Sequence, residues 1–153
     1  MLYLVRHAKA GNRSEWQQAD ELRPLSVSGW LQARGLAERL APLCSATLVS
    51  SPYVRCVQTL EPLATVLGTQ VAVDPCLAEG SDYEGALQLL ATLAEGAVLC
   101  SHGDVIPDTI AALERRGCAF DTEPDWRKAS IWVLRRAANG DITEASAWPP
   151  PDR

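Results

Sequence analysis

Apolar residues along the chain fall into short continuous runs and into stripes with helical spacing. The runs predict buried strands, because they are too short for helices and are bounded by Gly, Pro, Ser or Asn. They lie at residues 2–5, 46–49, 71–73, 97–100, 130–134 and 142–148. The last two runs flank Asn139-Gly140, a pair that favours the turn of a β-hairpin.

The stripes predict four amphipathic helices, each with an apolar position every third or fourth residue. One follows Ser26 as its N-cap and runs to Cys44, and a second begins at Ser51-Pro52 and ends at Gly68. The third opens with the capping box Ser81-x-x-Glu84, and the fourth follows residues 101–103 and ends at Gly117. Residues 8–25 and 118–128 show no period and are predicted to be loops.

Strands that alternate with helices and end in a hairpin predict an α/β fold. We expect a three-layer α/β/α sandwich with a mainly parallel central sheet and a C-terminal antiparallel hairpin at its edge. The length of 153 residues suits a single domain, residues 1–153.

Composition narrows the classes of function. A net charge of −5 disfavours a binder of nucleic acid polymers or membrane surfaces, and no run approaches the roughly 20 apolar residues of a membrane helix. The five cysteines are scattered without metal-binding spacing, which favours reduced core residues in a cytoplasmic protein, with a catalytic cysteine as the alternative. We find no secretory signal, and the oligomeric state is unknown.

The chain has two histidines, and each follows an apolar run after one intervening residue. His7 follows the first predicted strand and His102 follows residues 97–100, separated from them by one serine. The carboxyl ends of parallel strands meet at one edge of a sheet, where ligands gather in open α/β folds. We therefore expect the two imidazoles to share a site, although each histidine alone could be an ordinary loop residue.

Two arginines give this site a preference for phosphate. Arg6 ends the first strand, and Arg55 lies in the first turn of the second helix, where the helix dipole disfavours a cation unless an anion is shared there. Planar guanidinium groups bind phosphate through paired hydrogen bonds. A solvated surface arginine is the alternative for Arg55.

The absence of clustered carboxylates or zinc-type spacing predicts chemistry without a metal or cofactor. A phosphate pocket that contains histidine then favours covalent catalysis through a phosphorylated imidazole. His7 is the better nucleophile, since its neighbour Arg6 favours the neutral imidazole. His102 and the arginines would stabilise charge on the phosphoryl group.

Three motifs resemble the signatures of the histidine phosphatase superfamily, the phosphoglycerate-mutase-like fold. They are Arg6-His7-Ala8, Ser51-Pro52-x-x-Arg55-x-x-Gln58-Thr59 and Ser101-His102-Gly103. The resemblance implies a two-step phosphoryl transfer with His7 as nucleophile and with Arg6, Arg55 and His102 around the phosphate. Leu77-Ala78-Glu79 is similar to the family motif that supplies the general acid, and a solvated Glu79 is the alternative.

The motif Arg23-Pro24-Leu25-Ser26-x-x-Gly29 and the short length resemble the small SixA-like phosphohistidine phosphatases. The segments around His7, Arg55 and His102 are more similar to the phosphatase domain that is joined to a Nudix domain in actinobacterial MutT1-type proteins, and this chain leaves no room for a Nudix domain. The frequent Arg-His-Gly of the family is Arg-His-Ala here. With few residues left for a lid, we expect an open site that favours hydrolysis over mutase transfer.

The substrate stays open at this point. It could be a phosphomonoester, a phosphorylated nucleotide, another phosphorylated small molecule, or a phosphoprotein, including a protein phosphohistidine. The alternatives to an enzyme are a non-catalytic phosphate-binding module and a scaffold. Charged and polar candidates for substrate contacts, or for ordinary surface charges, are Lys9, Asn12, Arg13, Arg23 and Lys128. Trp16 and Trp126, in predicted loops, could stack on a ring or simply be exposed.

Overall fold

The computed structural model describes residues 1–151 and is built on one seven-stranded sheet. The last two positions of the predicted domain 1–153 lie outside the described residues. The strands are β1 (Leu2–Arg6), β2 (Leu48–Ser50), β3 (Val71–Val73), β4 (Val98–Ser101), β5 (Ala119–Phe120), β6 (Ile131–Arg136) and β7 (Ile142–Trp148). The helices are α1 (Val27–Leu40), α2 (Val54–Leu67), α3 (Glu84–Thr92) and α4 (Val105–Arg115), with 3₁₀ turns at Arg13–Glu15, Asp20–Leu22 and Pro75–Leu77.

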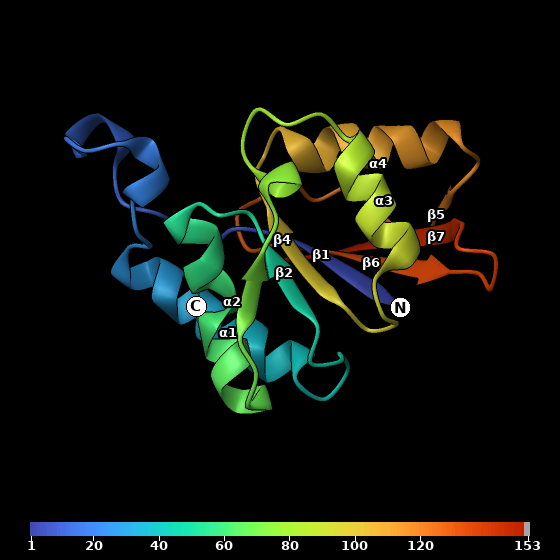
Figure 1. Ribbon diagram of the computed structural model, residues 1–153, viewed down its shortest axis with the longest axis horizontal. Coiled ribbons are helices and arrows are strands. Elements are labelled where there is room, and N and C mark those ends of the chain that lie inside the picture. The colour runs from blue at the N-terminus through green and yellow to red at the C-terminus, as the bar shows by residue number, and fades with distance from the viewer. Residues whose placement is uncertain (152–153) are drawn as a thin grey trace.

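The sheet has the strand order β3-β2-β4-β1-β6-β7-β5 (Figure 1). The pairs β3-β2, β2-β4 and β4-β1 are parallel, whereas β6 runs antiparallel to both β1 and β7. This confirms a mainly parallel sheet with an antiparallel C-terminal hairpin. The hairpin does not form the edge, however, because β5 pairs with the outer side of β7. A strand of two residues is too short to leave a pattern in the sequence.

Helices cover both faces of the sheet, which confirms the three layers. Figure 1 shows α1 and α2 on one side and α3 and α4 on the other. Side chains alternate between the faces along β1: Leu2 and Leu4 pack in the α3/α4 core, and Tyr3 and Val5 pack in the α1/α2 core. Among residues 1–151, no helix is long and apolar enough to cross a membrane.

Two of the predicted helix starts are wrong. Helix α2 begins at Val54 rather than at Pro52, although the Ser51 hydroxyl does accept the Tyr53 N–H as the predicted cap would. The predicted capping box at Ser81 does not form, because Asp82 accepts the Glu84 N–H at 2.9 Å. At this second start the Asp82 carboxylate competes with the expected cap.

The first helix also ends earlier than predicted. Helix α1 begins after Ser26, whose hydroxyl accepts the Gly29 N–H as expected of an N-cap. It ends at Leu40, and the chain turns before it reaches Cys44. The apolar stripe continued past the helix because Cys44 still packs against the same core from the turn.

Side chains from α1 and α2 anchor the segment that follows β1. The Ala8 N–H donates to the Thr59 hydroxyl at 2.9 Å, and the Lys9 N–H donates to the Gln32 side chain at 3.0 Å. A Cβ at position 29 would lie 1.8 Å from the Lys9 carbonyl oxygen, so Gly29 is required for this close approach. These contacts fix the backbone next to His7, the candidate nucleophile, which directly follows β1.

Candidate active site

The two histidines lie side by side at the carboxyl ends of neighbouring parallel strands. Arg6 pairs with Ser101 in the register of β1 and β4, and the His7 N–H donates to the Ser101 carbonyl at 3.1 Å. The imidazole rings of His7 and His102 meet edge to face with centroids 5.4 Å apart. The sequence prediction that the sheet brings the two histidines together is confirmed.

The surroundings of His7 fix its protonation state. Its Nδ1 lies 2.8 Å from the Ala8 carbonyl oxygen, which can only accept a hydrogen bond. Nδ1 therefore carries the proton, and Nε2 keeps a free electron pair. Burial, followed by the nearby charges of His102, Arg55 and Arg6, lowers the pKa of His7 to about 3. Burial is thus the first cause of the neutral imidazole, and Arg6 contributes less than we expected.

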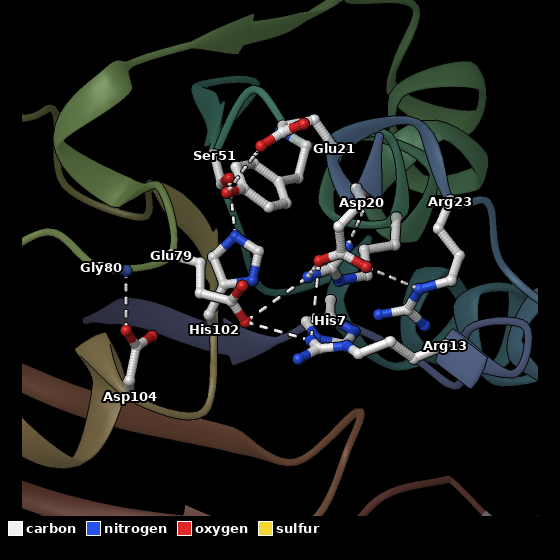
Figure 2. A network of polar contacts seen from close by, with 12 residues as sticks. His7, Arg13, Asp20, Glu21, Arg23, Ser51, Glu79, Gly80, His102 and Asp104 are labelled. Atoms are coloured by element: carbon white, nitrogen blue, oxygen red, sulfur yellow. Dashed lines mark hydrogen bonds and ion pairs between the residues drawn. The ribbon is translucent and has the colours of Figure 1, made fainter. Parts of the chain in front are cut away.

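His102 is buried among side chains of the segment that leads into α2. Its Nε2 lies 2.8 Å from the Ser51 hydroxyl, and the Tyr53 ring packs edge to face at 4.7 Å (Figure 2). Cys56 approaches the same ring, with its sulfur 3.5 Å from Nε2. Cys56 is fully buried and does not line the cavity described below, so the geometry gives no support to a catalytic cysteine.

Arg6 lies flat against the backbone of the third motif. Its Nη1 donates to the Trp126 carbonyl, and a Cβ at Gly103 would lie 2.7 Å from its Nη2. Glycine in Ser101-His102-Gly103 therefore leaves room for the guanidinium plane. Within residues 1–151, the buried Nε of Arg6 has no hydrogen-bond partner.

Arg55 is completely buried, so the alternative of a solvated surface arginine is wrong. Its Nη1 donates to the Asp20 carbonyl at 2.9 Å and its Nη2 to the Asp20 carboxylate at 3.0 Å. The guanidinium also stacks on the Tyr53 ring, 4.9 Å from its centroid. Its Nε, like that of Arg6, is buried and has no partner among the described residues.

Asp20 is a site residue that sequence reasoning missed. Besides Arg55, its carboxylate bonds Arg23 at 2.9 Å and lies 3.6 Å from Arg13 (Figure 2). Burial alone would raise the pKa of Asp20, but the hydrogen bonds and charges of Arg23 and Arg55 outweigh it and hold the pKa below its ordinary value. Asp20 therefore stays ionised and holds three arginines together.

Glu79 points into the site from the loop after the 3₁₀ turn at residues 75–77. Its carboxylate lies 3.4 Å from Arg13 and 3.5 Å from Arg55. The loop itself is held by Asp104, which accepts the Gly80 N–H at 2.7 Å (Figure 2). The ion pairs give Glu79 a defined position, while its side chain stays 36% exposed to solvent.

These residues surround a cavity of about 470 Å³. It is lined by Arg6, His7, Ala10, Gly11, Asn12, Arg13, Arg23, Glu79, Gly103, Asp104 and Lys128. Arg55 and His102 are buried and do not line it.

The predicted substrate contacts differ in how they meet this cavity. Asn12 lines it, although its side chain also caps the turn at Ser14, and Arg23 is a buried residue that bonds Asp20 and the Gly11 carbonyl. Lys9 is exposed and does not line the cavity.

The two loop tryptophans do not line the cavity, and the described residues contain no cluster of possible metal ligands. Trp16 donates to the Ala19 carbonyl and Trp126 packs on Trp132, with ring centroids 5.3 Å apart; neither lines the cavity. Within the described range 1–151, no three His, Cys, Asp or Glu side chains group as metal ligands would.

The sequence is similar to that of known proteins. Residues 2–92 match the model of the histidine phosphatase superfamily (branch 1). The chain is 35% identical to an 8-oxo-(d)GTP phosphatase of Mycolicibacterium smegmatis, an alignment that covers 97% of this chain and 48% of the relative. The chain thus spans about half the length of that protein.

Solved structures share the fold at lower identity. A protein histidine phosphatase SixA in complex with tungstate superposes with a TM-score of 0.75 at 22% identity, covering 98% of this chain and 96% of the other. A mycobacterial glucosyl-3-phosphoglycerate phosphatase gives a TM-score of 0.70 at 20% identity, covering 97% and 98%. With the family model and the strand-end histidines, these findings show that the chain belongs to the histidine phosphatase superfamily.

Proposed function

We propose that the chain is a metal-independent phosphatase that hydrolyses phosphorylated substrates through a phosphohistidine on His7. One observation carries this proposal: the buried Nε atoms of Arg6 and Arg55 have no partner among residues 1–151. Buried donors are almost always hydrogen-bonded in folded proteins, so two unsatisfied guanidinium donors near a neutral imidazole call for an anion. A phosphate fits, because it accepts several hydrogen bonds from arginine at once.

The geometry supports a role for each residue in the first step. The free electron pair on Nε2 of His7 attacks phosphorus, and the bond from phosphorus to the leaving oxygen breaks. Glu79, in its protonated form, gives a proton to that oxygen. Arg6, Arg55 and His102 stabilise the charge on the phosphoryl oxygens.

The second step returns the enzyme to its starting state. Glu79, now ionised, takes a proton from a water molecule, and the water oxygen attacks the phosphorus on His7. The bond from Nε2 to phosphorus breaks, and inorganic phosphate leaves. The cavity is large enough to admit this water beside the candidate acid.

We infer the substrate class from the site and from the relatives. The site suits a phosphomonoester or a phosphorylated nucleotide, the second of which is supported by the 8-oxo-(d)GTP phosphatase relative. A protein phosphohistidine, as the SixA structures suggest by name, is the second candidate. We also propose that residues 1–153 act as a single domain in the cytoplasm. The five free thiols favour the cytoplasm, where cysteines stay reduced.

The test is turnover of p-nitrophenyl phosphate in EDTA by the wild type and by His7→Ala. We expect metal-independent turnover that the substitution abolishes, and a phosphoenzyme that survives alkaline but not acid quenching. Turnover that persists in His7→Ala would overturn the mechanism. If the wild type binds phosphate but turns over neither this ester nor a phosphohistidine protein, the chain is a binding module.

A further inference from the structure

Lys128 is a cation that lines the cavity and has no partner among residues 1–151. It is half-buried and lines the same cavity as His7. Among the residues that the structure describes, none forms a hydrogen bond or an ion pair with its ammonium group. The arginines nearby differ: Arg13 and Arg23 both contact the Asp20 carboxylate, at 3.6 and 2.9 Å.

The backbone next to Lys128 is held in an unfavourable conformation. Ala129 has a φ of 67° and is completely buried. This left-handed region costs roughly 1–2 kcal/mol for a residue with a side chain. The Ala129 N–H donates to the carbonyls of Arg6 and His7, at 3.1 and 3.2 Å. These hydrogen bonds tie the segment that carries Lys128 to the end of β1 and hold Ala129 in its strained conformation.

The charges around Lys128 favour an additional anion. Burial, followed by repulsion from Arg6, Arg23, Arg55 and Arg13, lowers the pKa of Lys128. The carboxylates of Asp20 and Glu79 already pair with arginines and leave the ammonium uncompensated. An anion beside Lys128 would relieve this repulsion.

We propose that Lys128 binds an anionic group on the leaving group of the substrate, and that a second phosphate is its preferred ligand. The proposal rests on the proposed function, because it places the transferred phosphoryl group at Arg6 and His7. The cavity of about 470 Å³ has room for more than one phosphate, since small-molecule sites span roughly 300–1,000 Å³. The preferred substrate would then be a diphosphate.

A diphosphate would react by the same two steps, and water is the only other reactant. Nε2 of His7 attacks the terminal phosphorus, and the bond from that phosphorus to the bridging oxygen breaks. The bridging oxygen keeps the electron pair and leaves as part of the second phosphate. The Lys128 ammonium neutralises the charge that grows there, and water then hydrolyses the phosphohistidine.

The experiment compares inorganic pyrophosphate with two ligands that lack a second phosphate. Calorimetry in EDTA gives the Kd of pyrophosphate and of orthophosphate, and turnover gives kcat/KM for pyrophosphate and p-nitrophenyl phosphate. We expect the wild type to bind pyrophosphate more tightly than orthophosphate. In Lys128→Met this preference falls about tenfold, and kcat/KM falls about tenfold more for pyrophosphate than for p-nitrophenyl phosphate.

Arg127→Met is the matched control, because Arg127 is the adjacent cation but pairs with Asp125 outside the cavity. It should keep the wild-type preference, and Lys128→Arg should restore most of it. A preference unchanged in Lys128→Met would overturn the proposal, as would a wild type that binds both anions equally.

Two further arms separate this proposal from others. If O-phosphoserine, rather than pyrophosphate, depends on Lys128, the ligand is a carboxylate and the second phosphate is wrong. If the wild type turns over neither p-nitrophenyl phosphate, pyrophosphate nor a phosphohistidine protein, while the binding preference for pyrophosphate is found and is lost in Lys128→Met, the proposed function fails and the anion site stands.

Discussion

The candidate site has two parts that differ in origin and burial. The inner wall is our name for Arg6 and His7, which line the cavity, together with Arg55 and His102, which are buried and do not line it. These four residues come from strand ends and the start of a helix, and all but Arg6 are buried. The outer rim consists of Asn12, Arg13, Glu79 and Lys128, which come from irregular segments and are all at least partly exposed. Regular elements thus hold the groups that we propose to act on phosphorus, and loops hold the groups that we propose to meet the rest of the substrate.

This difference separates chemistry from selectivity. A group held by a sheet and a buried hydrogen-bond network needs little reorganisation during the reaction. A group on a loop can change without loss of the fold. Substitutions in the inner wall should therefore lower activity on every substrate, and those in the outer rim should change the ranking of substrates.

The largest effect should follow Arg55→Lys in the inner wall. Lysine lacks the planar guanidinium with which Arg55 bonds Asp20 through two nitrogens and presents a third to phosphate, so kcat/KM should fall by about 10²–10³-fold on all substrates. Steady-state kinetics with an aryl and an alkyl phosphate would show this. Arg34→Lys, on the exposed face of α1, is the control. A loss restricted to one substrate would break the division between the two parts.

Glu79→Gln should show the opposite behaviour, a loss that depends on the leaving group. An alkyl oxygen needs a proton as it leaves, whereas p-nitrophenolate does not. We expect the loss in kcat/KM for an alkyl phosphate to exceed the loss for p-nitrophenyl phosphate by about 30-fold. Equal losses on both esters would assign Glu79 to positioning of Arg13 and Arg55 instead.

His7 should make the protein less stable in acid. Its pKa of about 3 in the folded state lies below the ordinary 6.5, so only the unfolded chain takes up this proton as the pH falls between those values. At pH 5 the free energy of unfolding should be about 2 kcal/mol lower than at pH 7 from this group alone. Urea unfolding of the wild type and of His7→Asn at pH 5 and pH 7 measures this loss. Between pH 7 and pH 5, the variant should lose about 2 kcal/mol less free energy of unfolding than the wild type.

The smallest effect should come from Gly103→Ala. The added methyl group would lie 2.7 Å from Nη2 of Arg6 and displace the guanidinium, which should lower kcat/KM about tenfold, mainly through KM. Gly11→Ala is the control, because it lines the same cavity and its Cβ would have no neighbour closer than 3.9 Å. Similar losses in both variants would mean that Arg6 tolerates the shift.

The inner wall could be predicted from the sequence because its residues follow clear patterns. Apolar runs located β1 and β4, and the parallel sheet then required His7 and His102 to meet. The spacing of the second motif located Arg55 at the start of α2. The histidine inferences need only local periodicity and the geometry of a sheet, and Arg55 needs in addition the helix dipole and the resemblance to a family motif.

The contacts of the outer rim could not be predicted in the same way. Asp20 lies in a segment without a period, and its importance comes from arginines at positions 13, 23 and 55 that only the fold brings together. The positive φ of Ala129 and the two-residue strand β5 likewise have no sequence signal, since long-range hydrogen bonds determine both.

Strand β1 lies between β4 and β6, with hydrogen bonds on both edges and almost fully buried side chains from Leu2 to Val5. Amide protons in such a strand exchange with solvent only when the whole domain unfolds, whereas those of exposed loops exchange through local opening. We expect deuterium to label residues 11–22 long before β1. The backbone beside His7, the proposed nucleophile, is then as long-lived as the fold itself.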